Sequence, residues 1–211
     1  MSGVLGIATG TGCLTAVVAL DQDRRPIHQD ARAPSESMVA MLQWLNGEES
    51  SQREFDRYMA RLRYDYTAEA QHLVKMASTY HLALAVPRFP PDGLRASAMV
   101  GVGTSLTALH PGQQPWRGGE APEAGAGVSN HVLLPVGLFH DVLRRKALAA
   151  GLAAPWVDPS REVYFRCPLC LRADPTNRHF GEFHCRACMR EPVKDADLVV
   201  AWNTALDYPQ E

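Results

Sequence analysis

Four of the five cysteines in the chain stand in two matched pairs. Two residues separate Cys167 from Cys170 and Cys185 from Cys188, and fourteen residues lie between the pairs. A Cys-x-x-Cys segment turns tightly enough for both thiolates to face one point, so two such knuckles can complete a tetrahedral site. Four thiolates leave no open position for water or substrate. The spacing therefore predicts a structural Zn²⁺.

Paired cysteines can also form disulfides or a redox motif. Two matched pairs argue against a single redox motif. The N-terminal sequence MSGVLGIATG is short and glycine-rich and lacks the basic start of a secretory signal. We therefore expect a reducing, cytoplasmic location, where thiols remain available to a metal. The fifth cysteine, Cys13, lies in an apolar segment and is expected to be a small buried side chain.

Short strands are expected beside the cysteine pairs, at residues 163–166 and 179–184, which together describe a zinc ribbon. The next segment, KDADLVVAWN, is typical of the start of a helix. Asp195 suits the N-cap, and Asp197 falls in the first turn, where the helix dipole favours a carboxylate. Capping alone is a sufficient explanation for both aspartates.

Basic residues outnumber acids around the four cysteines, and aromatic rings lie between them. Because rings can stack on bases while guanidinium groups bind phosphates, this segment is a candidate nucleic-acid surface. The alternative is that the rings pack the small core of the ribbon itself. The candidate nucleic-acid-binding residues are Arg166, Arg172, Arg178, Arg186, Arg190 and Lys194.

Composition limits the possible functions. The chain has 211 residues, 46% of them hydrophobic, which is enough for one sizeable core. No apolar run reaches transmembrane length, so no membrane partner is expected. The formal net charge of −2 argues against a stand-alone protein that binds nucleic acid by overall charge. No nucleophile and base combine into a recognisable triad, and no small-molecule substrate is evident.

Apolar patterning predicts strands and helices in mixed order ahead of the ribbon. In the second expected helix, Arg57, Arg61 and Arg63 lie near one another and could meet phosphates, although a solvated face is the commoner explanation. A Gly- and Pro-rich stretch is expected to form a mobile loop. The expected strands are 3–10, 13–20, 26–33, 81–86, 153–157 and as a further candidate 98–103, the helices 37–46, 54–79 and 135–150, and the loop 110–130.

The order of these elements resembles an RNase H-like fold of the RuvC type with a zinc ribbon before its last helix. The chain is similar to the C-terminal half of TnpB-type transposon-encoded RNA-guided nucleases and of the related type V CRISPR effectors. The recognition lobe and the guide-holding wedge domain of that family have no counterpart here. The residues that carry the resemblance are 6–10, 75–86, 143–146 with Gly151, 157–159, Cys167-Pro168-x-Cys170 and Asp195-x-Asp197-x₃-Ala201-x-Asn203.

The resemblance implies a nuclease centre in which acids from two strands and the last helix hold two Mg²⁺ ions about 4 Å apart. In this chain the first acid position falls on Ala8. The second falls at or next to Pro87, or on Gly103 if residues 98–103 form that strand. Only the third acid remains, as Asp197. One carboxylate cannot neutralise two divalent cations, so we expect no Mg²⁺ site and no intact catalytic set.

The sequence thus predicts an α/β fold, with a mixed sheet flanked by helices and a four-cysteine zinc ribbon inserted before the last helix. It divides into a RuvC-like domain at 1–160, the ribbon at 161–194 and a returning helix at 195–211. Three functions are compatible with it. The first is a non-cleaving subunit of an RNA-guided complex, which binds guide RNA or DNA beside a separate protein subunit. The others are a protein–protein adaptor and a nuclease completed by another chain.

Overall fold

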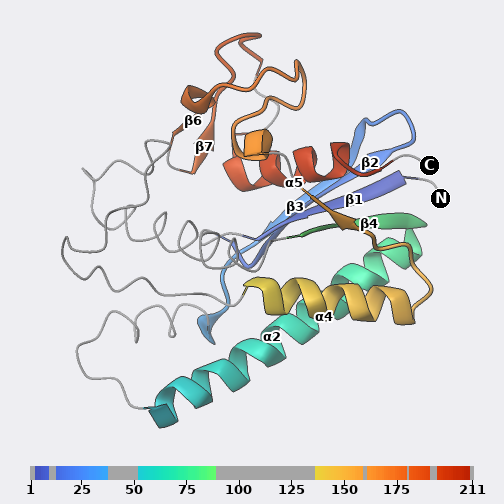
Figure 1. Ribbon diagram of the computed structural model, residues 1–211, viewed down its shortest axis with the longest axis vertical. Coiled ribbons are helices and arrows are strands. Elements are labelled where there is room, and N and C mark those ends of the chain that lie inside the picture. Colours follow the sequence, from blue (N-terminus) through green and yellow to red (C-terminus); the bar gives the residue numbers. More distant parts are fainter. Residues whose placement is uncertain are drawn as a thin grey trace.

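The computed structural model describes residues 3–9, 13–37, 52–88, 136–158, 161–179, 181–190 and 194–209 (Figure 1). Its strands are β1 (Gly3–Ala8), β2 (Thr15–Asp21), β3 (Pro26–Arg32), β4 (Leu82–Pro87), β5 (Trp156–Val157), β6 (Arg178–His179) and β7 (Glu182–Phe183). Its helices are α2 (Gln52–Thr79), α4 (Val136–Ala149), α5 (Ala196–Leu206) and the short 3-10 helices η1 (Arg161–Tyr164) and η2 (Pro175–Asn177).

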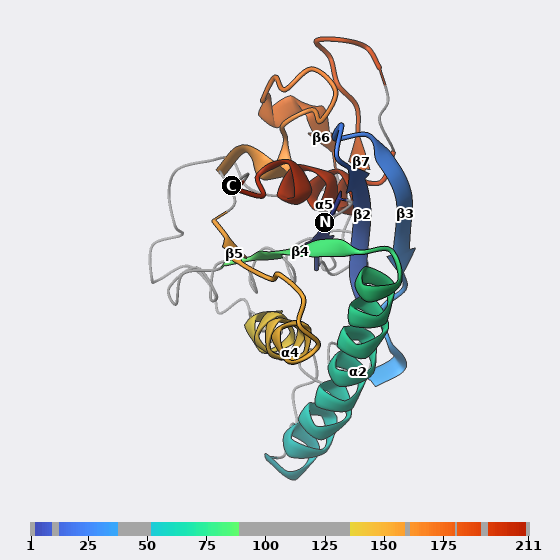
Figure 2. The same cartoon turned by 90° about the vertical axis from the view of Figure 1, so that its right-hand side faces the viewer.

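Five strands form one mixed sheet in the order β3-β2-β1-β4-β5. The first three strands are antiparallel neighbours, whereas β4 runs parallel to β1 and β5 parallel to β4. Parallel neighbours need a crossover connection, and α2 and α4 lie in those two connections. Both helices lie on one side of the sheet, and α5 lies on the other with the cysteine-bearing segment beyond it (Figures 1 and 2).

Alternate residues of β1 serve opposite faces of the sheet, as the period of a strand requires. Leu5 and Ile7 are fully buried in the core beneath α2 and α4. Gly6 and Ala8 face α5 instead. Burying a large aliphatic side chain contributes roughly 1.5–3 kcal/mol, so the α2–α4 face supplies much of the burial free energy.

The first of these helices, α2, is amphipathic from Leu62 onward. Its buried positions Leu62, Tyr66, Leu73 and Ala77 recur at helical spacing and pack on the sheet. The ring of Tyr66 meets that of Phe139 from α4, with centroids 5.4 Å apart. The two helices are therefore joined to each other as well as to the sheet.

On the other face, α5 approaches β1 so closely that only glycine fits at position 6. A Cβ atom on Gly6 would lie 2.1 Å from the carbonyl oxygen of Ala201 and 2.6 Å from the Cβ of Ala205. The small residues of α5 make this approach possible. Gly6 thus allows the short distance between α5 and β1, and this distance determines where the side chains on the sheet-facing side of α5 lie.

Most of the elements expected from the sequence are confirmed. The strands expected at 3–10, 13–20, 26–33 and 81–86 are β1 to β4, and the helices expected at 54–79 and 135–150 are α2 and α4, with small shifts at their ends. Gly151 follows α4 with a φ of 74°, as expected of a residue that ends a helix. The last strand of the sheet is shorter than expected. The predicted elements at 98–103 and 110–130, and all but the first residue of 37–46, lie outside the described residues.

The strand expected at residues 163–166 is wrong. In place of the single strand expected at 179–184, the structure has two short strands, β6 and β7, which pair with each other as a hairpin. Residues 161–164 form η1, and Arg166 makes only an isolated bridge to Ala173. The cause lies in α5. The side-chain amide of Asn203 donates to the carbonyl oxygens of Val163 and Arg166, at 2.9 and 2.7 Å. A tight turn brings two such carbonyls to one amide, whereas an extended strand separates them by about 10 Å.

Candidate metal centre and acidic site

The four paired cysteines converge on one point. Their Sγ atoms all lie within 4.8 Å of one another. The Sγ atoms of Cys167 and Cys188 are 3.8 Å apart, and those of Cys170 and Cys185 are 3.6 Å apart. Thiolates bound to a tetrahedral Zn²⁺ at about 2.3 Å stand about 3.8 Å apart, whereas disulfide sulfurs are about 2.05 Å apart. All five cysteines are free thiols, and this donor set fits a zinc ion.

Both cysteine knuckles close in the same way. The N–H of Leu171 donates to the carbonyl oxygen of Cys167 at 2.8 Å, and the N–H of Met189 donates to that of Cys185 at 3.1 Å. Leu171 and Met189 each follow the second cysteine of a knuckle and adopt left-handed φ angles of 61° and 52°. Their apolar side chains are 61% and 88% exposed. Each knuckle therefore presents one large apolar residue to the solvent.

The thiols of the cluster differ in acidity. Burial raises the pKa of Cys167 to about 12. Burial acts in the same direction on Cys185, but the backbone N–H groups of Cys188 and Ala187 help to outweigh it, and the pKa of Cys185 is lowered to about 7. A metal binds the thiolate form, so zinc binding at this cluster would release protons and strengthen as pH rises.

A small core joins the cysteine cluster to α5. Phe183 of β7 is fully buried, and Ala196 and Val199 of α5 pack against it. The buried ligands Cys167 and Cys185 belong to the same core. Because Phe183 is buried here, at least part of the aromatic set of this segment serves its own packing, as the alternative interpretation of the sequence expected.

Hydrogen bonds fix the start of α5 beside the β6–β7 hairpin. Asp195 caps the helix, because its carboxylate accepts from the N–H groups of Asp197 and Leu198 at 2.8 and 3.1 Å. This is the capping role expected from the sequence. The N–H of Phe183 donates to the carbonyl oxygen of Lys194 at 2.7 Å, so the hairpin and the helix start are linked through the backbone.

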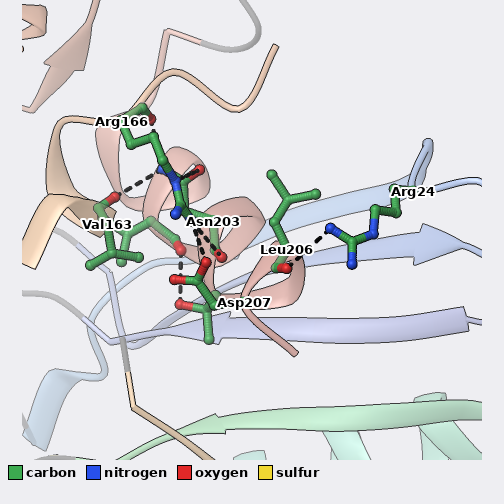
Figure 3. A network of polar contacts seen from close by, with 8 residues as sticks. Arg24, Val163, Arg166, Asn203, Leu206 and Asp207 are labelled. Carbon is green, nitrogen blue, oxygen red and sulfur yellow. Dashed lines mark hydrogen bonds and ion pairs between the residues drawn. The ribbon is translucent and has the colours of Figure 1, made fainter. Parts of the chain in front are cut away.

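A polar network ties the segment ahead of the cysteines to the end of α5 (Figure 3). Arg166 Nη2 donates to Asp207 Oδ1 at 2.6 Å and to the carbonyl oxygen of Asn203 at 3.3 Å. Asn203 is fully buried, and its amide holds the η1 turn as described above. The Arg166 and Asp207 side chains are only 15% and 19% exposed. Charge-assisted bonds in such a setting contribute about 1.5–3 kcal/mol each.

The two positions expected to have lost their acids are the last residues of two neighbouring parallel strands, β1 and β4. The pairing of these strands sets Gly6 opposite Ala85. Ala8 and Pro87 are both buried, and neither side chain offers a ligand atom. The alternative second position, Gly103, lies outside the described residues.

The remaining acid, Asp197, is engaged by protein groups on both of its oxygens. Arg178 Nη2 donates to Oδ1 at 3.2 Å, and the thiol of Cys13 donates to Oδ2 at 3.5 Å. The guanidinium supplies the positive charge that a metal would otherwise bring. Within the described residues, the cysteine cluster is the sole group of three or more potential metal ligands.

Two buried polar residues that were not predicted from the sequence contact Thr15 at the start of β2 and Thr9 just after β1. Glu69 of α2 is 1% exposed, accepts from Thr15 Oγ1 at 2.6 Å and pairs with Arg32 at 2.5 Å. His140 of α4 is equally buried, and its Nε2 lies 3.3 Å from Thr9 Oγ1. Burial lowers the pKa of His140 to about 3, so its ring is neutral at physiological pH.

The sequence did contain a signal for Glu69. It lies three residues after Tyr66 and four before Leu73, both of which are buried, so its carboxylate stands on the apolar stripe of α2. A charged residue at such a position needs a partner inside the fold. Asn203 gave a weaker signal, because an amide near the end of a helix has many possible roles.

The six predicted nucleic-acid-binding residues fall into two groups. Arg166 and Arg178 are bound inside the protein, to Asp207 and Asp197, and Arg178 also lies 6.0 Å from the centre of the Tyr164 ring. The side chains of the other four are exposed. These four are Arg172, Arg186, Arg190 and Lys194.

No helix in the described part of the chain is long and apolar enough to cross a membrane. No protein-family model and no curated protein matches the chain. Its fold is similar to that of a chain in a cryo-EM structure of the Cas12f1–sgRNA–target DNA complex, with a TM-score of 0.61 and 11% sequence identity. The match covers 97% of this chain and 50% of the other, so this chain spans about half the length of that protein. The chain therefore has a Cas12f-like α/β fold, with a mixed sheet and a four-cysteine cluster between β5 and its last helix.

Proposed function

We propose that this chain is a catalytically inactive RuvC-like and zinc-ribbon protein that binds nucleic acid as a non-cleaving subunit of an RNA-guided complex. The proposal rests on the Cas12f-like fold, together with the family resemblance of the sequence, which implies acids at three positions, two of which are occupied here by Ala8 and Pro87. The similar structure is a complex with sgRNA and target DNA, which supports nucleic acid as the class of partner. The proposal also includes a separate protein subunit as a partner of this chain.

The chemistry of the acidic site supports binding without cleavage. Two-metal hydrolysis of a phosphodiester needs several carboxylates to hold both cations beside the reacting oxygens. Asp197 alone offers at most one, and a Mg²⁺ ion would first have to displace Arg178 from it. We therefore propose no Mg²⁺-dependent step for this chain.

Zn²⁺ is the proposed resident of the cysteine cluster, and its role is structural. Cys167, Cys170, Cys185 and Cys188 would supply four thiolates, and two of them already share a core with α5. The metal would thus fix the β6–β7 hairpin against the helix that carries Asp197. Free thiols persist in a reducing compartment, so the proposed location of this chain is the cytoplasm.

The six candidate basic residues of the ribbon have two different proposed roles. Arg172, Arg186, Arg190 and Lys194 are exposed and are the proposed contacts to phosphate. Arg166 and Arg178 form ion pairs within the protein, so they would position the ribbon on α5 instead of meeting the nucleic acid. The first group should therefore affect affinity, and the second should affect folding.

Salt-dependent binding of the zinc-loaded chain to a short single-stranded RNA and a short duplex DNA tests the proposal. The ribbon triple variant, Arg172→Gln, Arg186→Gln and Arg190→Gln, removes three proposed phosphate contacts. The slope of log K against log salt should then become shallower by about 2–3, since each contact contributes about 0.7–0.9. The control triple variant, Arg25→Gln, Arg145→Gln and Lys146→Gln, removes the same charge elsewhere and should bind like the unmodified chain.

Two outcomes would overturn this function. Failure of the unmodified chain to bind either nucleic acid at low salt excludes the binding role. Mg²⁺-dependent cleavage that disappears in Asp197→Asn would show a working nuclease centre, completed by residues not expected to serve it. A second protein that restores cleavage would favour the nuclease assembled from two chains.

One observation favours the adaptor as the second candidate. The knuckles expose Leu169, Leu171 and Met189, which are 44%, 61% and 88% exposed, beside the cysteine cluster. Exposed apolar residues gathered at one site commonly mark a protein-binding surface. If Leu171→Ser with Met189→Ser releases a copurifying protein and leaves nucleic-acid affinity unchanged, the ribbon is an adaptor.

A further inference from the structure

The exposed face of α2 carries a row of positive charge that the proposed function does not use. An α-helix turns about 100° per residue, so Arg53, Arg57, Tyr64, Gln71 and Lys75 fall within about 40° of one line along its surface. All five side chains are exposed. This line lies opposite the buried stripe that packs on the sheet. We call the row, together with the flanking Arg61 and Arg63, the α2 stripe.

Few compensating acids accompany the stripe among the side chains that the structure describes. Among the described side chains of α2, Asp56 is the only exposed acid, against the cations Arg53, Arg57, Arg61, Arg63 and Lys75. None of these five forms an ion pair with a described residue. Arg32, Arg166 and Arg178, in contrast, all have acidic partners within the fold.

The spacing of the charges opposes helix stability. Arg53, Arg57 and Arg61 follow one another at four-residue steps, which places like charges on adjacent turns of one helix. Each such pair destabilises a helix by a few tenths of a kcal/mol, whereas an ordinary solvated face alternates the two signs. An external anion would remove this repulsion.

The size and place of the stripe fit an extended polyanion. From Arg53 to Lys75 the helix rises about 33 Å at 1.5 Å per residue, close to one turn of a nucleic-acid duplex. The first part of α2 extends past the sheet, on the side away from α5 and the ribbon (Figures 1 and 2). The stripe is thus a second surface, separate from the exposed cations of the ribbon.

We propose that the α2 stripe binds the phosphate backbone of a nucleic acid along its length, without reading the base sequence. Arg53, Arg57 and Arg61 contact successive phosphates. The ring of Tyr64 is 75% exposed in the middle of the row, and it stacks on a base when the bound strand is single. This inference rests on the proposed nucleic-acid role and adds a second site to it.

The test is a stripe triple variant, Arg53→Gln, Arg57→Gln and Arg61→Gln, compared with the control triple variant Arg25→Gln, Arg145→Gln and Lys146→Gln. Glutamine is a good helix former, so α2 should persist, and circular dichroism checks that it does. The stripe variant should make the salt slope of binding shallower by about 2–3, whereas the control should leave it unchanged. Parallel series with single-stranded RNA and duplex DNA identify the preferred polymer.

Tyr64→Ala separates stacking from charge. Affinity for the single strand should fall roughly tenfold and affinity for the duplex should not change, because only an unpaired base can stack on the ring. An equal effect on both, or on neither, overturns the stacking step.

The results distinguish failure of this inference from failure of the proposed function. If the unmodified chain binds nucleic acid and the ribbon triple variant weakens binding, but the stripe variant matches the control, only the α2 stripe is excluded. If the unmodified chain binds neither polymer, both fail. A stripe variant that loses a copurifying protein but keeps its salt slope would make α2 a protein-docking surface and overturn the inference.

Discussion

The cysteine cluster and the acidic site both depend on α5, but they differ in how much of each remains. The cluster retains four ligands that converge within 4.8 Å, with Ala196 and Val199 of α5 packed against it. Of the three acid positions that the family resemblance implies, the acidic site has a carboxylate only at Asp197, with Ala8 and Pro87 at the other two. Two of the thiols, those of Cys167 and Cys185, belong to a hydrophobic core, whereas Asp197 is held by polar contacts.

Electrostatics indicates what the proposed absence of two acids would mean for the acidic site. Three carboxylates held together repel one another unless cations lie between them, so a fold that has only one of them would not need Mg²⁺ for its stability. The last acid then needs one positive neighbour, and Arg178 supplies it. The cysteine cluster has no such substitute, because without its ligands the hairpin keeps only a very small core.

Removal of a cysteine ligand is expected to have the largest effect on stability. It tests whether the cysteine cluster is a structural metal site. Structural zinc sites contribute about 10–16 kcal/mol of apparent binding free energy. Cys185→Ala should abolish stoichiometric zinc and remove amide-exchange protection from β6, β7 and the first turn of α5. Elemental analysis and hydrogen exchange measure the two effects.

Cys13→Ala is the matched control for that variant. Cys13 is buried, forms no disulfide and contacts Asp197, and it does not belong to the cysteine cluster, so this variant should keep its zinc. If Cys185→Ala also keeps its zinc and its protected hairpin, the cluster is not the metal site and the contrast fails.

A side chain at position 6 should disturb both sites at once, since both depend on the place of α5. In Gly6→Val the new side chain meets the backbone of Ala201, and we expect a loss of about 3 kcal/mol or more in the free energy of unfolding. Urea denaturation measures the loss. Gly181→Ala, where nothing lies within 4 Å of a new Cβ, should change stability by less than about 0.5 kcal/mol. Equal stability of the two variants would mean that α5 tolerates a larger distance from β1.

Acid should destabilise the protein through His140, which lies at the same end of the sheet as the acidic site. Its pKa in the folded chain is about 3, against an ordinary value of 6.5, so the unfolded chain binds a proton that the folded chain refuses. The contribution of His140 is therefore fully present above pH 6.5 and is lost as pH falls toward 3. The slope approaches about 1.4 kcal/mol per pH unit, or roughly 2 kcal/mol between pH 7 and 5.

Comparison with His140→Leu isolates this effect from proton uptake by the cysteines. Urea denaturation at several pH values should give a shallower dependence in the variant, by about one proton. Identical pH dependence in both proteins would show that the ring of His140 is hydrated in the folded state.

Much of this fold could be predicted from local patterns. Three features could be predicted from the local sequence alone, without knowing what they pack against. They are the periodic apolar residues of α2, the continuous apolar run of β4 and the spacing of the cysteines. The strand expected at 163–166 failed because its backbone is held by Asn203, thirty-seven residues after Arg166. Such a tertiary hydrogen bond leaves no mark on the turn that it creates.

The sequence predicted which types of residue make up the candidate site, but not which basic residue pairs with which acid. Arg166 and Arg178 looked like the other basic residues of the ribbon, because spacing does not show which cation lies beside an acid from α5. The register between β1 and β4, which pairs Gly6 with Ala85, likewise depends on sheet pairing between residues far apart in the sequence.

Neutralisation of Asp197 has the smallest expected effect on the free energy of unfolding. The sign of this change, stabilising or destabilising, is the informative result. The Arg178–Asp197 pair joins side chains that are each 22% exposed, so Asp197→Asn should destabilise the chain by only about 0.5–1 kcal/mol. Arg178→Gln should cost a similar amount, and the double variant should cost less than the sum because the pair is then already broken. In a cluster of crowded carboxylates the same substitution would stabilise the metal-free protein. Greater stability of Asp197→Asn, together with a shift of unfolding by Mg²⁺ that only the unmodified chain shows, would return Asp197 to a working metal site.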